Sequence, residues 1–182
     1  MSQLRLEKDD LYNLPDLAPP DGYSVRNYRD GDEVGIAQVF ATSSLSDDLP
    51  ESVLRILVRK PCFRPERVFI VEHACGIVAT ASAWVEEADP DSGYLHMVGV
   101  LPEHRGKRLG ALVSAAAIRY SRDEGFSRVR LLTDDWREAA LKTYIGLGFY
   151  PLYADDTHPQ RWAAIASKFE RPDILERARA VC

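Results

Sequence analysis

The sequence has few cysteines, few lysines and no long hydrophobic run. Its three cysteines, Cys62, Cys75 and Cys182, are odd in number and far apart, which argues against a disulfide framework and favours a reducing compartment, the cytoplasm. We interpret all three as structural and expect no metal. No apolar run approaches the roughly 18 residues of a membrane span, so no membrane partner is expected. The formal net charge of −5 argues against nucleic-acid binding.

The rest of the composition is typical of one folded domain. The chain has 182 residues, of which 46% are hydrophobic and 28% charged, so a core can form without disulfides. Basic residues are mostly arginine, which favours planar, bidentate recognition of anions. Three prolines and a glycine interrupt residues 1–22, and we predict an irregular N-terminal lead-in there. Residues 23–182 are predicted to be a single domain that includes C-terminal helices.

Hydrophobic spacing predicts an α/β fold with a mixed sheet. The expected order is β-α-α-β-β-β-α-β-α-β, followed by C-terminal helices. The segment from 94 to 133 has the length of a β-α-β crossover between parallel neighbours. The predicted strands are 23–28, 67–72, 77–86, 94–100, 128–133 and 149–153.

Residues 98–110 give the strongest functional signal. A strand ends, a short basic loop follows, and a helix begins. Helix N-termini present unpaired N–H groups and a partial positive charge. Arg105, Lys107 and Arg108 add three charges within four residues, and Gly106 lets a phosphate approach the backbone. We interpret the loop as an anion site suited to a pyrophosphate; the alternative is a solvated basic turn.

A second signal lies in residues 140–149, ALKTYIGLGF. This segment places Tyr144 on the helix that follows the next strand, near the mouth between the two parallel strands. The alternative is an ordinary core tyrosine at helical spacing.

Together these segments resemble the GNAT acetyltransferases. Arg105 to Gly110 resembles that family's acetyl-CoA loop, and the Ala-x-x-x-Tyr-x-x-x-Gly-Phe segment resembles its closing motif. The resemblance implies a central mixed sheet whose two parallel strands splay apart, with helices on its faces and acetyl-CoA as the acetyl donor. The pantetheine arm would pair with the backbone near Val98 and Val100, and the pyrophosphate would lie on the loop amides. The implied cofactor-binding residues are Val98, Gly99, Val100, Arg105, Gly106, Lys107, Arg108, Leu109, Gly110, Ala111 and Arg137.

The resemblance also implies transfer of the acetyl group to an amine by direct attack, with Tyr144 as the general acid for the departing thiolate. A tyrosine with a pKa of ~10 can hydrogen-bond or protonate a sulfur whose thiol pKa is ~8.5. The acceptor is expected to be a small-molecule or peptide amine. The protein could also form a homodimer. Two alternatives stay open: a non-catalytic acyl-CoA-binding or sensing module, and a protein or peptide N-acetyltransferase.

The general base is less clear from the sequence. No acid stands at the start of the 94–100 strand; His96 lies there, and a strand period of two puts it on one face with Val98 and Val100. Its ordinary pKa of ~6.5 suits deprotonation of an ammonium through a water. Asp134, or water alone, is the alternative. Glu86 and its neighbour Glu87 are candidates for attracting a cationic acceptor.

Two residues depart from the family pattern. Arg108 stands where the family usually has glycine, and Arg137 where it often has asparagine. Arg108 opens a helix, so we expect an ordinary negative φ there and a guanidinium that aids phosphate binding rather than blocking the loop. We therefore expect Arg108→Gly to weaken acetyl-CoA binding about tenfold or more.

Overall fold

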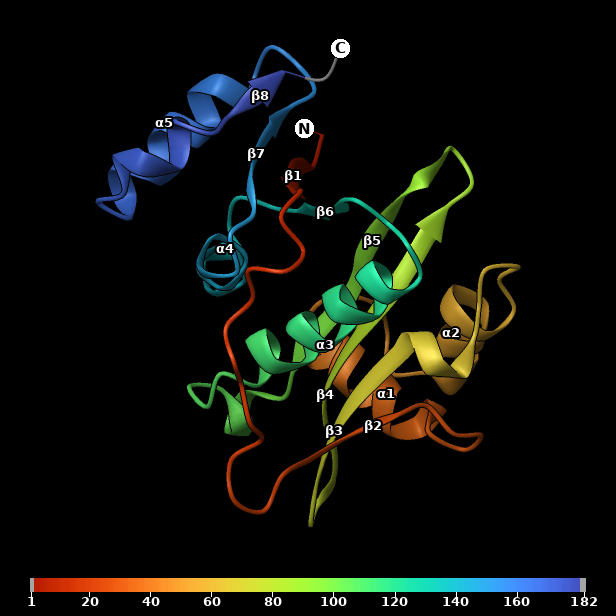
Figure 1. Cartoon of the computed structure of the whole chain (residues 1–182). Coiled ribbons are helices and arrows are strands. Elements are labelled where there is room, and N and C mark those ends of the chain that lie inside the picture. Colours follow the sequence, from red (N-terminus) through yellow and green to blue (C-terminus); the bar gives the residue numbers. More distant parts are fainter. Residues whose placement is uncertain (1, 181–182) are drawn as a thin grey trace.

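The computed structural model describes residues 2–180 and consists of one eight-stranded mixed sheet with helices packed on its two faces (Figure 1). The sheet order is β2-β3-β4-β5-β6-β1-β7-β8. The strands are β1 Leu4–Lys8, β2 Ser24–Asn27, β3 Val68–His73, β4 Gly76–Glu86, β5 Asp89–Val100, β6 Val129–Thr133, β7 Tyr150–Tyr153 and β8 Arg179–Ala180. The predicted mixed α/β fold is confirmed, and so is the predicted element order from β2 to α5; the short strand β8 at the C-terminal end was not predicted.

The helices divide the hydrophobic core in two. One cluster packs the sheet against α3 (Leu109–Asp123), α4 (Glu138–Gly146) and α5 (His158–Lys168), and the other lies beneath α1 (Glu33–Thr42) and α2 (Pro50–Val53). Within residues 2–180 no helix is long and apolar enough to cross a membrane. The longer helices are α1 Glu33–Thr42, α3 Leu109–Asp123, α4 Glu138–Gly146 and α5 His158–Lys168. The short helix α2 Pro50–Val53 continues as a π turn over Leu54–Val58. Short 3-10 turns cover Pro65–Arg67, Pro102–His104 (η3) and Pro172–Leu175.

The prediction of an irregular lead-in over residues 1–22 is wrong for its first part. Leu4–Lys8 forms β1, which lies between β6 and β7 and runs antiparallel to both. The sequence hid this strand because it is short and highly charged. Glu7 is nevertheless buried, since Arg130 Nε lies 2.8 Å and Tyr150 Oη 2.7 Å from its carboxylate oxygens. Both partners are distant in sequence, and the strand belongs to the same sheet as the rest of the domain.

The two parallel strands in the middle of the sheet diverge, as the family resemblance implied. β5 and β6 pair only at Gly93 with Val129 and at Tyr94 with Arg130. Beyond those pairs β5 continues to Val100 without β6 beside it. The divergence leaves backbone of β5 unpaired on one side, and that gap positions the candidate site.

Candidate active site

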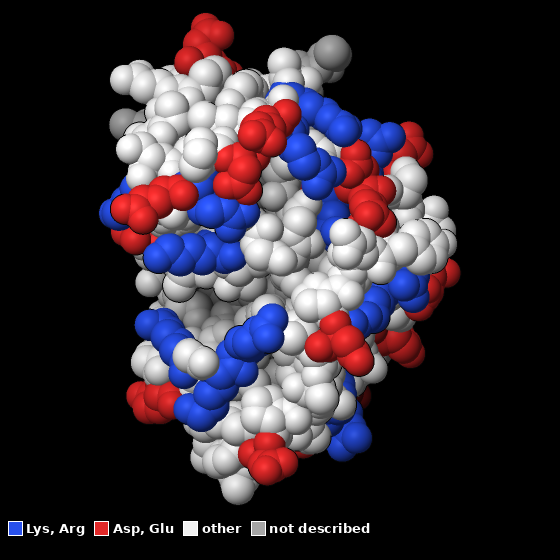
Figure 2. Space-filling view, turned by 60° about the vertical axis from the view of Figure 1, so that its left-hand side comes forward, with Lys and Arg blue, Asp and Glu red and all other residues white. Residues whose placement is uncertain are grey.

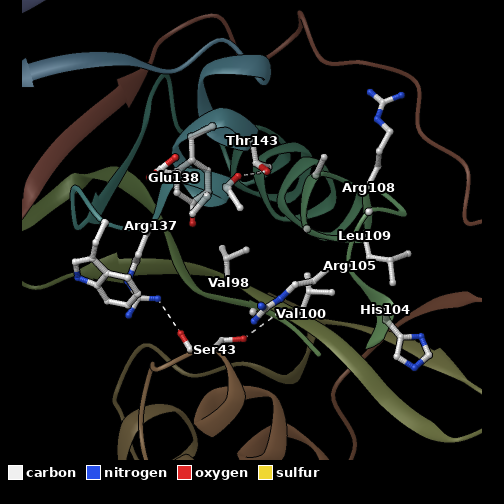
Figure 3. A pocket seen from close by; sticks show the side chains of 18 residues that line it. Ser43, Val98, Val100, His104, Arg105, Arg108, Leu109, Arg137, Glu138 and Thr143 are labelled. Atoms are coloured by element: carbon white, nitrogen blue, oxygen red, sulfur yellow. Dashed lines mark hydrogen bonds between the residues drawn. The ribbon is translucent and has the colours of Figure 1, made fainter. Parts of the chain in front are cut away.

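A cavity of about 560 Å³ opens where β5 and β6 separate. Its walls are the end of β5, the loop and first turn of α3, α4 with the two residues before it, and Ser43 just after α1 (Figure 3). Tyr144 and ten of the eleven predicted cofactor residues line it, whereas Lys107 does not. The volume lies within the ~300–1,000 Å³ range of ligand sites. Segments separated by some forty residues in sequence therefore meet in one space.

The basic loop that enters α3 has two residues in the left-handed backbone region. Gly106 has φ +79°, and a Cβ there would contact nothing within 4 Å, so backbone conformation rather than space favours glycine. Arg108 has φ +60° and ψ +17°. The expectation of a negative φ at Arg108 is therefore wrong, because this residue precedes the first helical residue, Leu109, and turns the chain into the helix.

The two arginines of this loop point in different directions. In Figure 3 Arg105 reaches across the cavity, where its Nη2 donates to the carbonyl of Thr42 at 3.3 Å. Arg108 extends away from the cavity in the same view. Figure 2 shows Lys and Arg side chains bordering a hollow in the surface, although the net charge of the chain is −5. Such an arrangement favours an anionic ligand.

The end of α1 packs directly against β5, and Gly99 permits this. A Cβ at Gly99 would lie 2.7 Å from Val39 Cγ1 and 2.8 Å from Ser43 Oγ. The close approach lets the Val100 N–H donate to Ser43 Oγ at 3.2 Å. Sequence reasoning missed Ser43, which is an ordinary residue just after a helix. The Ser43 hydroxyl accepts from the Val100 N–H, in the stretch of β5 that is expected to pair with the pantetheine arm. A pantetheine arm that pairs with this N–H would therefore have to replace the hydrogen bond to Ser43.

Arg137 braces α4 against the end of α1. Its Nη1 donates to the Ser43 carbonyl at 2.9 Å, its Nη2 to the Ser44 carbonyl at 2.6 Å, and its Nε to Asp134 at 3.1 Å. The guanidinium also stacks 4.4 Å from the ring centre of Trp136, an exposed side chain that lines the cavity. Arg137 thus lines the cavity, and its donors are directed to protein oxygens.

Tyr144 lies on α4 with a buried ring that packs edge-on against Phe149. Burial raises the pKa of Tyr144 to about 12, and the positive charge of Arg137 acts in the opposite direction. The hydroxyl is therefore protonated at neutral pH. A protonated tyrosine in this cavity has the state that a proton donor needs.

The expectation that His96 shares a face with Val98 and Val100 is wrong, because a β-bulge interrupts β5. Thr80 pairs with Gly99 and Ser82 with His96, so two residues of β5 stand opposite one residue of β4. The extra residue shifts the alternation by one position. Val98 and Val100 face the cavity, whereas His96 stacks on Trp84, 5.3 Å between ring centroids, and lines a second cavity.

The second cavity has a volume of about 710 Å³ and lies beside the β4–β5 hairpin. Burial, together with the charge of Lys60, lowers the pKa of His96 there to about 4. Glu86 and Glu87 also line this cavity, as do Arg55 and Lys60, so its charges are mixed. Asp134, the alternative base, lines neither cavity and is paired with Arg137.

The interpretation of the cysteines as structural needs revision at one position. Cys62 is half-buried beside the second cavity, but Cys75 is exposed in the turn between β3 and β4. Both are free thiols. Cys182 lies outside the described residues.

A family model described as "Acetyltransferase (GNAT) family" matches residues 36–149, more than half of the chain. The chain belongs to the GNAT acetyltransferase family. A mycothiol acetyltransferase of Thermobispora bispora is 30% identical over 145 residues, which cover 75% of this chain and 49% of that protein. The chain thus spans about half the length of the curated relatives it matches.

Solved structures support the GNAT fold. A GCN5-related N-acetyltransferase from Sphaerobacter thermophilus superposes with a TM-score of 0.63 at 18% identity, covering 83% of this chain and 49% of that one. The diaminobutyrate acetyltransferase EctA from Paenibacillus lautus, in complex with L-2,4-diaminobutyric acid and coenzyme A, gives 0.55 at 17% identity, covering 68% and 73%.

Proposed function

We propose that this GNAT protein binds acetyl-CoA in the cavity between β5 and β6 and transfers the acetyl group to an amine. One observation carries the proposal. The cavity brings together backbone of β5 that does not pair with β6, the basic loop at the N-terminus of α3, and a protonated Tyr144. These three parts match the peptide-like arm, the pyrophosphate and the leaving sulfur of acetyl-CoA.

The residues of the cavity fit this ligand part by part. The amides from Arg105 to Ala111 lie at a helix N-terminus, where the partial positive charge favours phosphate. Arg105 adds a guanidinium that reaches across the cavity. On β5, Val98 and Val100 present backbone and apolar side chains to the pantetheine arm.

The chemistry assigned to Tyr144 is proton donation. Acetyl-CoA supplies an activated acetyl group, and its sulfur leaves as the new amide bond forms. Tyr144 holds a proton at its hydroxyl because burial raises its pKa to about 12. Donation of that proton to the departing sulfur avoids a free thiolate in an enclosed site. The proton that the attacking amine loses returns the hydroxyl to its starting state through solvent.

We do not propose His96 as the general base. A histidine with a pKa of about 4 is too weak a base to deprotonate an ammonium efficiently. It also lies across the strand from the cavity that holds Tyr144. The proposal is that the acceptor attacks as its neutral amine, with water taking the proton.

We favour a small-molecule acceptor. Two curated relatives, each matching 75% of this chain, are named for mycothiol, a small molecule. The alternative is a sensor that binds acyl-CoA without turnover. Retention of a protonated Tyr144 in the cavity supports the enzyme over the sensor.

A thiol-release assay with acetyl-CoA and a panel of amines, amino acids and peptides tests the proposal. Acetyl-CoA at ~100 times its Kd adds ~2.7 kcal/mol of stability, or several degrees in melting temperature. No shift at millimolar acetyl-CoA refutes binding. A shift without thiol release for any acceptor supports the sensor instead. Tyr153→Phe, a change outside the cavity on β7, is the matched control for Tyr144→Phe.

A further inference from the structure

Three side chains that can ligate a metal meet beside the cofactor loop: His73, Cys75 and His104. His73 ends β3, Cys75 lies in the turn that leads to β4, and His104 ends η3. Their ligating atoms all lie within 4.8 Å of one another. The cluster was not visible in the sequence, because His104 follows Cys75 by 29 positions and no regular zinc-ligand spacing connects the three.

We propose that His73, Cys75 and His104 form a zinc site with one thiolate and two imidazole ligands. Cys75 Sγ lies 3.5 Å from His73 Nδ1 and 3.5 Å from His104 Nε2. Two ligands of one tetrahedral zinc ion, with Zn–S of about 2.3 Å and Zn–N of about 2.0–2.1 Å, stand about 3.5 Å apart. Both sulfur–nitrogen separations therefore already have the values that a shared ion requires.

The surroundings of His104 support the assignment. Its second ring nitrogen, Nδ1, lies 2.9 Å from the hydroxyl oxygen of Tyr23. A zinc-bound histidine needs such a partner, because the N–H of the other nitrogen must be satisfied and this fixes which nitrogen faces the ion. The Tyr23 ring also packs against both imidazoles, with ring centroids 4.7 Å from His73 and 5.7 Å from His104.

The donor set selects a borderline-soft ion. A cysteine thiolate with two neutral histidines suits Zn²⁺ and is unsuited to Mg²⁺ or Ca²⁺, which prefer oxygen ligands. Binding breaks the Cys75 S–H bond, forms the Zn–S bond and releases one proton to solvent. Three protein ligands leave a fourth position for water.

The site ties the β3–β4 turn to the start of the cofactor loop. His104 lines the proposed acetyl-CoA cavity and directly precedes Arg105. In Figure 3 it stands at the edge of the cavity, on the side of Arg105 and Leu109. Zinc would therefore hold in place the residue from which the phosphate-binding loop begins. The zinc proposal rests on this cluster alone and does not depend on acetyl transfer.

The test is zinc titration of the reduced, metal-free full chain against a chromophoric chelator. We use a variant with Cys62→Ser and Cys182→Ser as the reference, which leaves Cys75 as the chain's single thiol. The expected result is one Zn²⁺ per chain, with micromolar or tighter affinity and a rise in melting temperature of several degrees. His73→Gln, Cys75→Ser and His104→Gln, each in that reference, should each weaken zinc binding by at least about 100-fold, since loss of an outer partner alone costs ~10–100-fold.

A spectroscopic measurement excludes an adventitious surface ion. With Co²⁺ in place of zinc, the reference variant should show a thiolate-to-cobalt charge-transfer band and the intense visible bands of a tetrahedral ion, and Cys75→Ser should lack the charge-transfer band. Circular dichroism of each variant checks that it is folded; Cys75 is exposed in a turn, so its replacement should not unfold the chain. The proposal is overturned if the reduced protein does not bind zinc below about 100 µM, or if Cys75→Ser binds it like the reference.

Discussion

Replacement of Arg108 by glycine should stabilise the protein. Arg108 adopts φ +60° immediately before α3. For a residue with a Cβ this conformation costs about 1–2 kcal/mol. Glycine adopts it freely but loses more backbone entropy on folding, which costs about 0.5–1 kcal/mol. The difference between the midpoints of these two ranges is a net gain of about 0.75 kcal/mol in free energy of unfolding, or ~1.5–3 °C in melting temperature for a chain of this length.

The matched control is Arg108→Ala, which removes the same charge and keeps the Cβ. Thermal unfolding followed by circular dichroism should place Arg108→Gly above Arg108→Ala, with the alanine variant at or slightly below the parent protein. A glycine variant no more stable than the alanine variant would show that the left-handed conformation carries no strain, and the reasoning would fail.

The same pair of variants separates charge from backbone in cofactor binding. Arg108 is exposed and extends away from the cavity, so its guanidinium contributes as a screened surface charge, about 1 kcal/mol or less. We expect both variants to bind acetyl-CoA up to about fivefold more weakly, with a loss that shrinks at high salt. This effect is smaller than the tenfold expected from the sequence. A difference in affinity between the two variants, measured by calorimetry, would contradict it.

Tyr144→Phe should lower kcat by ~10²-fold or more with little change in acetyl-CoA affinity, because it removes only the proton donor; an unchanged kcat in the thiol-release assay would make the residue structural. Gly99→Ala should lower the free energy of unfolding by about 1–3 kcal/mol, since its Cβ would meet Val39 Cγ1 at 2.7 Å. Gly110→Ala is the control, because the nearest atom to its Cβ is 3.5 Å away, and denaturant unfolding compares the two variants. The folded-state pKa of His96, about 4, lies below the ordinary ~6.5. The buried neutral imidazole therefore makes its full contribution to the free energy of unfolding above pH ~6.5, and this contribution is lost as the pH falls to about 4. Over that range the parent should lose about 1–3 kcal/mol more stability than His96→Phe, which cannot titrate; equal slopes would rule out the burial of a neutral histidine.

Local patterns in the sequence predict the order of elements from β2 to α5 and the place of the cofactor loop. Both rest on local signals: the spacing of apolar residues in α3 and β6, and the joining of strand, basic loop and helix at residues 98–110. Tyr144 was found in the same way, from its position on the helix that follows β6. Such features can be predicted from the sequence because the residues that produce them are neighbours along the chain.

The features that local patterns do not reveal depend on residues that are far apart in the chain or on single backbone angles. β1 was missed because the partners that satisfy its buried Glu7 come from β6 and β7. His96 was assigned to the wrong face because one extra residue in β5 shifts the alternation of its side chains. The approach of His104 to the turn that holds Cys75 likewise requires η3 and the end of β3 to meet in space. Patterns of side chains predict which element forms, but only packing fixes which side chains then face one another.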